Sequence, residues 1–303
     1  MKSKHIIMIA CAALFGATRT NAQGQTLPIL TANTDARTAA MGNASVAAEG
    51  MYLYNNPSAL FGVDKKFTAD ASASIYEKEE GVEGTFGLYT ATVGYKFAKR
   101  HAAFAGFRYA GGLKVKGFNM LGEPTKDYKP YDWTIDFGYA YVIGKGFSVY
   151  ATGSIIFSHL SKNANGGAFT VGASYQNNDM TVANKSANFM VDAKVAAIGP
   201  KLDYGNGYKV SMPTHVAVGG ALSVDMADKH QVGAAVSARY FFQPSETKVF
   251  MAGGGLEYTY NNMVSVRAGY EYGDHNLSHF TMGAGIKYRG LRLNGGYMLK
   301  TVD

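Results

Sequence analysis

Large apolar side chains alternate with small or polar ones along much of the chain, with a period of two residues. Residues 131–143 show this most clearly: every odd position is apolar or aromatic, and the even positions are Asp, Thr, Gly, Ala or Val. Side chains alternate across a β-strand, so this segment has one apolar face and one small, partly acidic face. Its 13 residues exceed the typical strand of about 5–6 and suffice for the about 9–11 of a membrane-spanning strand.

The same alternation predicts thirteen strands. They cover residues 67–76, 85–97, 102–110, 131–143, 147–158, 168–175, 188–198, 213–224, 230–241, 248–259, 263–272, 279–288 and 291–299. Most connections alternate between short and long, which is typical of outer-membrane barrels with short periplasmic turns. Residues 176–187 are the exception, because they form a long connection where a short one is expected.

The odd number of strands conflicts with the even number found in single-chain bacterial barrels. Three explanations are open. A strand is missed at residues 113–120 or in the N-terminal region, the last strand is absent, or the first and last strands pair in parallel. We therefore expect an all-β, transmembrane antiparallel β-barrel of about 14 strands with an N-terminal luminal or plug segment.

A soluble sandwich also alternates, but its solvent face usually carries many Lys and Glu residues. Here the less apolar face is mostly Gly, Ser, Thr and Ala, which suits a lumen. Tyrosines near the strand ends fall on the apolar face, as in an interfacial girdle. They are Tyr240, Tyr258, Tyr270, Tyr272, Tyr288 and Tyr297.

Residues 1–22 have the features of a secretory signal peptide, with Lys2 and Lys4 before an apolar run at residues 6–17. Cleavage is expected before Gln23, although Cys11 leaves a lipoprotein signal as an alternative. Removal of residues 1–22 takes away the one cysteine of the 303-residue chain and leaves 26 Lys and Arg against 22 Asp and Glu. The mature chain has no dense basic run or known motif, so nucleic-acid binding is not expected.

Residues 23–66 precede the strands and are predicted to form the luminal or plug segment, and residues 67–303 the outer-membrane barrel. Small residues dominate positions 34–42, and Asn56 followed by Pro57 predicts a helical start. A periplasmic arm is the alternative location. The candidate plug residues are Asp35, Arg37, Met41, Asn55, Asn56 and Pro57. The predicted lumen-facing charges are Asp132, Asp136, Asp192, Lys194, Arg239, Glu257 and Arg267.

Register across the last turns predicts two charged pairs. If Tyr260 pairs with Val264, Glu257 lies opposite Arg267, a contact that contributes about 0.2–1 kcal/mol. Lys287 and Arg292 would also face each other, which is unfavourable unless an acid or an anionic ligand lies nearby. A wet periplasmic rim, where salt screens the repulsion, is the favoured explanation of the second pair.

Catalytic chemistry is not predicted. The sequence lacks His-Glu-x-x-His, a phosphate-binding loop and Gly-x-Ser-x-Gly. Asp274, His275 and His279 lie close together, but their spacing matches no established ligand pattern. We expect no enzyme activity, no cofactor and no metal.

Residues 35–42 followed by residues 56–60 resemble the N-terminal signature of FadL-like barrels, especially their PorV/PorQ branch. Residues 131–143 with 146–149, 198–202 with 212–214, 254–258 and 267–270 agree with this resemblance. It implies a fourteen-stranded barrel in outer-membrane lipid, with an N-terminal segment in the lumen. Family members continue into one more strand, whereas this sequence ends at Asp303.

The resemblance implies two functions. PorV-type proteins work with protein partners in type IX secretion or surface attachment, and FadL-type channels take up hydrophobic small molecules through a side opening. Residues 253–255 and 219–220 are glycines that could kink a strand for such an opening, or could pack closely against the luminal segment. We expect a multi-pass protein of the outer membrane that works in secretion or attachment, with a hydrophobic ligand as the alternative to protein partners.

Overall fold

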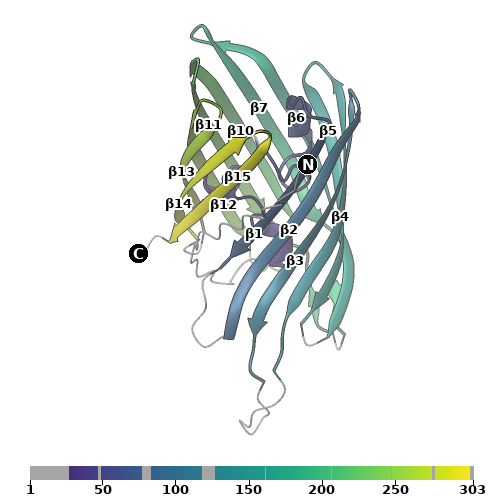
Figure 1. The fold of residues 1–303 in the computed structure, drawn as a ribbon. Coiled ribbons are helices and arrows are strands. Elements are labelled where there is room, and N and C mark those ends of the chain that lie inside the picture. Colours follow the sequence, from purple (N-terminus) through teal and green to yellow (C-terminus); the bar gives the residue numbers. More distant parts are fainter. Residues whose placement is uncertain are drawn as a thin grey trace, which may run out of the picture.

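The computed structural model describes residues 27–46, 49–76, 83–117, 127–160, 162–205, 207–246, 248–274 and 277–300. Within them, one antiparallel sheet of 13 strands curves into a barrel (Figure 1). Each strand pairs with the next long strand in the chain, so the thirteen predicted strands are confirmed. The strands are β1 (Phe67–Ile75), β2 (Glu83–Ala98), β3 (His101–Lys114), β4 (Tyr131–Gly144), β5 (Phe147–His159), β6 (Asn163–Val182), β7 (Lys185–Ile198), β10 (His215–Ala227), β11 (His230–Phe241), β12 (Val249–Tyr260), β13 (Val264–Gly273), β14 (His279–Tyr288) and β15 (Leu291–Lys300).

The alternation in sequence gives the sheet, which forms the wall of the barrel, an outer and an inner face of different polarity. On β4, Phe137 is 54% exposed on the outside, whereas its neighbour Asp136 is 1% exposed on the inside. Trp133 also lies on the outer face and stacks on Phe157 of β5 with ring centroids 3.9 Å apart. An apolar exterior and a polar interior are the arrangement that a lipid environment requires.

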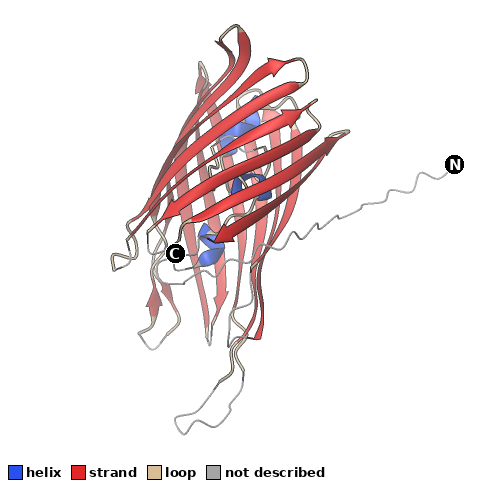
Figure 2. Cartoon of the chain, turned by 90° about the vertical axis from the view of Figure 1, so that its left-hand side faces the viewer, coloured by secondary structure: helices blue, strands red, loops and turns tan. Residues whose placement is uncertain are grey.

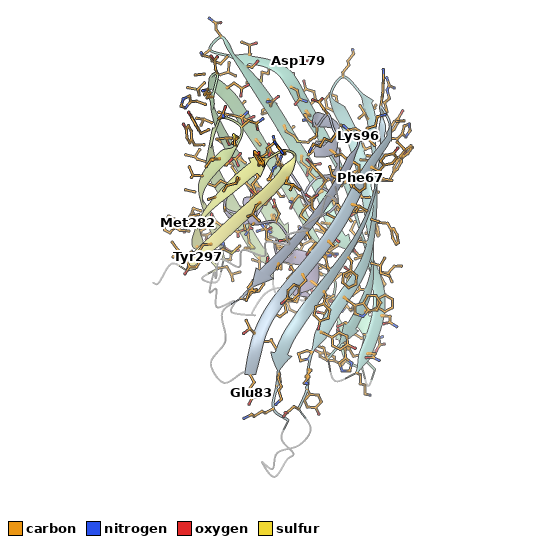
Figure 3. The ribbon with its side chains drawn as sticks, in the orientation of Figure 1. Phe67, Glu83, Lys96, Asp179, Met282 and Tyr297 are labelled. Atoms are coloured by element: carbon orange, nitrogen blue, oxygen red, sulfur yellow. The ribbon has the colours of Figure 1, made fainter. Side chains whose placement is uncertain are left out.

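One end of the barrel carries short turns and the other carries longer loops, and we call them the short-turn end and the long-loop end. Figure 3 labels Glu83 near the long-loop end and Lys96 and Asp179 near the short-turn end. The exception at residues 176–187 disappears, because β6 and β7 extend through them to a turn at Ala183 and Asn184. Both turn residues have positive φ, as hairpin turns require. Their polar composition concealed the strands.

Two more elements depart from the predicted boundaries. β3 runs to Lys114 and so includes the start of the 113–120 alternative, but residues 118–120 lie outside the described residues. The predicted 199–212 loop contains a small hairpin of β8 (Leu202–Asp203) and β9 (Lys209–Val210). Leu202 is fully buried against Leu27 and Ile156, so this hairpin helps to close the lumen at the long-loop end.

β1 and β15 are the two edges of the sheet, and among the described residues they do not pair with each other. They are the first and the thirteenth strand of the sheet. Because neighbouring strands are antiparallel, these two strands run in the same direction. A further strand antiparallel to both would close the wall. A cavity of about 670 Å³ lies at this seam, and Ala71, Ala73 and Gly295 are among the residues that line it. No helix in the described part of the chain is long and apolar enough to cross a membrane.

Residues 27–46 and 49–62 of the N-terminal segment lie inside the barrel, where Figure 2 shows the helices. It forms α1 (Pro28–Thr31), α2 (Ala36–Ala39) and the 3-10 helix η1 (Pro57–Gly62). The side chain of Asp35 caps α2 by accepting hydrogen bonds from the backbone N–H groups of Arg37 and Thr38. Asn56 caps η1 by accepting from the Ser58 N–H at 3.0 Å, and Pro57 occupies the first turn as predicted.

The outer face should tolerate charge only near its ends. We expect Leu256→Arg, in the middle of β12 and 63% exposed, to lower the free energy of unfolding in lipid vesicles by about 2–4 kcal/mol. Leu291→Arg, at the short-turn end of β15, is the matched control and should cost about 0–1 kcal/mol. Denaturant titration of the vesicle-inserted protein measures both, and equal costs would contradict a lipid-facing belt.

Candidate functional site in the plugged lumen

Residues 27–46 and 49–62, which we call the plug, fill the lumen with both apolar and polar contacts. Its apolar core includes Met41, Leu53 and Leu60, which are at most 3% exposed. They pack in one cluster with wall residues such as Phe104 and Tyr150. The candidate site is therefore the interface between the plug and the inner wall.

Glycines on the inner face let the plug backbone lie directly against the wall. A Cβ atom at Gly255 would lie 2.5 Å from the Met41 Cα, and one at Gly269 would lie 2.5 Å from the Gly42 N. Such distances leave no room for any side chain. We call this surface the glycine track, and it consists of Gly253, Gly255, Gly269, Gly283 and Gly296. Of the two explanations for residues 253–255, these distances favour packing against the luminal segment.

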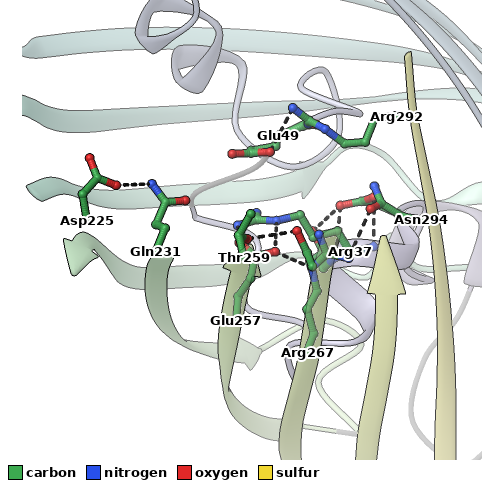
Figure 4. Close-up of polar contacts among 12 residues, drawn as sticks. Arg37, Glu49, Asp225, Gln231, Glu257, Thr259, Arg267, Arg292 and Asn294 are labelled. Atoms are coloured by element: carbon green, nitrogen blue, oxygen red, sulfur yellow. Dashed lines mark hydrogen bonds and ion pairs between the residues drawn. The ribbon is translucent and has the colours of Figure 1, made fainter. Parts of the chain in front are cut away.

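Arg37 of α2 joins the plug to the wall through a buried ion pair (Figure 4). Its Nη2 donates to Glu257 Oε1 at 2.8 Å and its Nε donates to Glu257 Oε2 at 3.0 Å. Arg267 also donates to Glu257, which lies directly opposite it as the turn register predicted, and to Asn294 Oδ1 at 3.1 Å. Burial opposes the charge on Arg37, but the Glu257 carboxylate more than offsets this and raises the pKa of the guanidinium.

A second buried cluster surrounds Arg108 of β3. Arg108 Nη2 donates to Asp136 Oδ1 at 2.8 Å, and its Nη1 donates to the Ile29 carbonyl of the plug at 2.8 Å. The Tyr54 hydroxyl donates to Asp136 Oδ2 at 2.8 Å, and the Arg108 guanidinium lies 4.6 Å from the Tyr54 ring centre. Burial raises the pKa of Tyr54, so this phenol stays protonated and remains a donor.

Two further clusters complete the contact. Lys194 Nζ donates to the Asn55 carbonyl at 2.7 Å. Asp192 accepts hydrogen bonds from Tyr150 and Ser174, and Ser174 also contacts Asn56. In the last cluster, Glu271 accepts from Arg239 of the wall and from Asn43 of the plug. Every cluster thus joins a wall charge to a plug residue directly or through one intermediate group.

The structure brings most of the candidate residues into this interface. Asp35 receives hydrogen bonds from the plug itself, including one from Asn55 Nδ2 at 3.4 Å, and Met41 lies on the glycine track. Of the predicted lumen-facing charges, Asp136 meets the plug through Tyr54. Asp132 instead accepts a hydrogen bond from Ser158, whose hydroxyl also contacts Tyr204 beyond the β8 strand.

Sequence reasoning missed Arg108, Tyr150 and Glu271. All three are at most 5% exposed and lie on the inner face of strands that were correctly predicted. The two-residue alternation placed them inward, so parity alone could have found them. Their partners could not be found that way, because each contact depends on the register of several strands and on the path of the plug.

A cavity of about 130 Å³ remains between the plug and the wall. Charged groups from three of the clusters line it, including Arg108, Asp136, Asp192, Lys194 and Arg239. This space suits a few water molecules, which need polar partners, better than an apolar ligand.

In the described part of the chain no group of His, Cys, Asp and Glu side chains could hold a metal ion. Asp274 accepts from the Phe250 N–H at 2.8 Å, and His275 lies outside the described residues.

Solved structures, one of them of a FadL homologue, share the fold of this chain. The toluene transporter TodX of Pseudomonas putida is similar with a TM-score of 0.53 and 13% identity, covering 86% of this chain and 90% of that one. TbuX of Ralstonia pickettii, also a toluene transporter, gives 0.51 and 15%, covering 87% and 90%. A FadL homologue of Pseudomonas aeruginosa gives 0.52 and 14%, covering 92% and 93%. At these identities the likeness shows the fold alone.

The family is shown by sequence. The model of the type IX secretion system protein PorV matches residues 16–248, which is more than half of the chain. The chain belongs to the PorV family. No curated protein matches it significantly.

Loss of the Arg37 charge should loosen the plug. We expect Arg37→Met to lower the free energy of unfolding by about 1–3 kcal/mol, because it removes two hydrogen bonds to a buried carboxylate that keeps Arg267 as a partner. Arg292→Met removes the more exposed pair with Glu49 and should cost less than about 1 kcal/mol. Hydrogen exchange of residues 35–46 should accelerate in the first variant only.

The glycine track gives an independent test of the same contact. We expect Gly255→Ala to displace Met41 and to destabilise the protein by about 1–3 kcal/mol through overpacking. Gly220→Ala is the control, since its nearest neighbour would lie 3.6 Å away on the outer face, and it should change stability by less than about 0.5 kcal/mol. Limited proteolysis and thermal unfolding would show this difference, and identical behaviour would contradict close plug packing.

Proposed function

We propose that this protein is a non-catalytic, multi-pass barrel of the outer membrane that works with other proteins in type IX secretion or surface attachment. The match to the PorV family over residues 16–248 carries this proposal. The structure supports it because the plug is tied to the wall by four charged clusters. A barrel with a filled lumen suits a docking platform better than a conduit.

The alternation of loop lengths gives the orientation. Short turns face the periplasm in bacterial outer-membrane barrels, and longer loops face outward. We therefore assign the short-turn end, with its turns at Lys145 and at Asn261 and Asn262, to the periplasm. The long-loop end, closed partly by the β8–β9 hairpin, faces the exterior and is available to cargo or attachment partners.

A second candidate is a channel for hydrophobic small molecules. The cavity at the seam favours it, because apolar side chains such as Ile75, Phe107 and Met298 line part of it, beside charged groups that include Asp70 and Arg292. The fold likeness to toluene transporters agrees with this alternative. The charged lining of the 130 Å³ luminal cavity argues against a route through the centre of the barrel.

Deletion of the gene in the source bacterium, followed by complementation, separates the two candidates. We expect the deletion to abolish surface attachment of type IX cargo, and the wild-type gene to restore it, while toluene uptake stays unchanged. Crosslinking of the affinity-tagged protein in outer membranes should recover secretion components. Intact cargo attachment combined with slower toluene uptake would favour the channel and refute the main proposal.

A further inference from the structure

Positive charge is concentrated at one sector of the short-turn end. Three segments near the edges of the sheet, residues 65–66, 96–100 and 287–292, carry eight cationic side chains there, accompanied by the two carboxylates Asp64 and Glu49. We call this surface the basic patch, and its cations are Lys65, Lys66, Lys96, Lys99, Arg100, Lys287, Arg289 and Arg292. Its surplus of six positive charges exceeds the surplus of four carried by the whole mature chain, so the rest of that chain carries two more negative than positive charges.

Hydrogen bonds join the segments into one surface. Lys65 Nζ donates to the Gly290 carbonyl at 3.2 Å, which connects the approach to β1 with the β14–β15 turn. The Lys96 backbone N–H donates to the Lys66 carbonyl at 2.8 Å, which connects the end of β2 with the same approach. The patch therefore crosses the seam and is continuous, although its residues are more than 200 positions apart in sequence.

Three cations of the patch face the mouth of the lumen, whereas Arg289 lies over the outward-facing ring of Tyr288. Lys287 and Arg292 lie directly opposite each other on the inward-facing row of β14 and β15. Their neighbours Ile286 and Tyr288 are both 56% exposed on the outer face. Lys96 is also on an inward row and donates to the Val63 carbonyl. An anion that meets these three cations must approach from the periplasm.

More cations have a carboxylate partner at the long-loop end than in the basic patch, among the described residues. At the long-loop end, Lys114 pairs with Glu83 at 3.1 Å and with Asp127 at 2.9 Å, and Lys209 pairs with Asp203 at 3.2 Å. In the basic patch, Arg292 with Glu49 at 2.9 Å is the ion pair found among the described residues. Like charges across a strand pair are unfavourable, and of the facing Lys287 and Arg292 only Arg292 has a carboxylate partner among the described residues. The remaining positive charge of the patch therefore favours an external anion.

We propose that the basic patch binds an acidic segment of a polypeptide on the periplasmic side of the membrane. Arginine and lysine spread over three segments can contact several carboxylates along an extended chain, and Arg–carboxylate contacts are the stronger kind. Such a surface accelerates association and selects for charge, and salt weakens it. The patch lies outside the plug interface, so this proposal does not require the secretion function, only the assigned orientation.

Fluorescence anisotropy with a labelled peptide of alternating Glu and Ser tests the proposal, using the full-length protein in zwitterionic nanodiscs. We expect saturable binding that weakens as salt rises from about 50 to about 300 mM. The triple variant Lys99→Gln, Arg100→Gln, Arg289→Gln should weaken binding about tenfold or more. These side chains are exposed turn residues, and unchanged thermal unfolding will show that the barrel is intact.

A charge-matched triple variant at the other end provides the control. Lys129→Gln, Lys201→Gln and Lys248→Gln remove three exposed cations and should change the affinity less than about twofold. Absence of peptide binding by the wild type, or equal losses in both triple variants, would overturn the proposal. Loss of peptide binding in nanodiscs that contain phosphatidylglycerol would also overturn it, because lipid headgroups would then occupy the patch.

Discussion

A membrane barrel with a polar inner face must find partners for that face, and this requirement governs the structure. The plug supplies them. Arg37 shares Glu257 with Arg267, Tyr54 shares Asp136 with Arg108, and the Asn55 carbonyl receives Lys194. Single buried charges would be costly, and paired and hydrogen-bonded ones are tolerated. Neither the wall nor the plug is a self-sufficient unit, because each satisfies the polar groups of the other.

The two-residue alternation was enough to predict the wall, because a strand between lipid and lumen has a different solvent on each face. All thirteen strands were found, and the errors fell at their ends. Residues 176–187 lie where β6 and β7 extend beyond the alternating region, so polar composition concealed a hairpin. The β8 and β9 strands have two residues each, which is too short for any periodic signal.

The site was less predictable. The Glu257–Arg267 pair follows from one hairpin turn, so local register sufficed. The ion pair between Arg37 and Glu257 joins residues that are 220 positions apart in sequence. No local sequence pattern predicts a contact between residues so far apart. The glycines at residues 253–255 leave two explanations open in the sequence, since a glycine in a strand serves a kink and a close contact equally well. The position of the Met41 and Gly42 backbone was needed to decide between them.

The glycine track has a consequence for the order of assembly. Its members come from β12 to β15, at the end of the chain, and the segment that lies on it is near the beginning. The surface that contacts residues 36–42 is therefore complete only when the last strands have paired. Contacts of such long sequence separation form late, because loop closure must precede them. A partly assembled wall lacks the surface against which the N-terminal segment packs. A correctly packed segment therefore indicates that synthesis and insertion have reached the final strands.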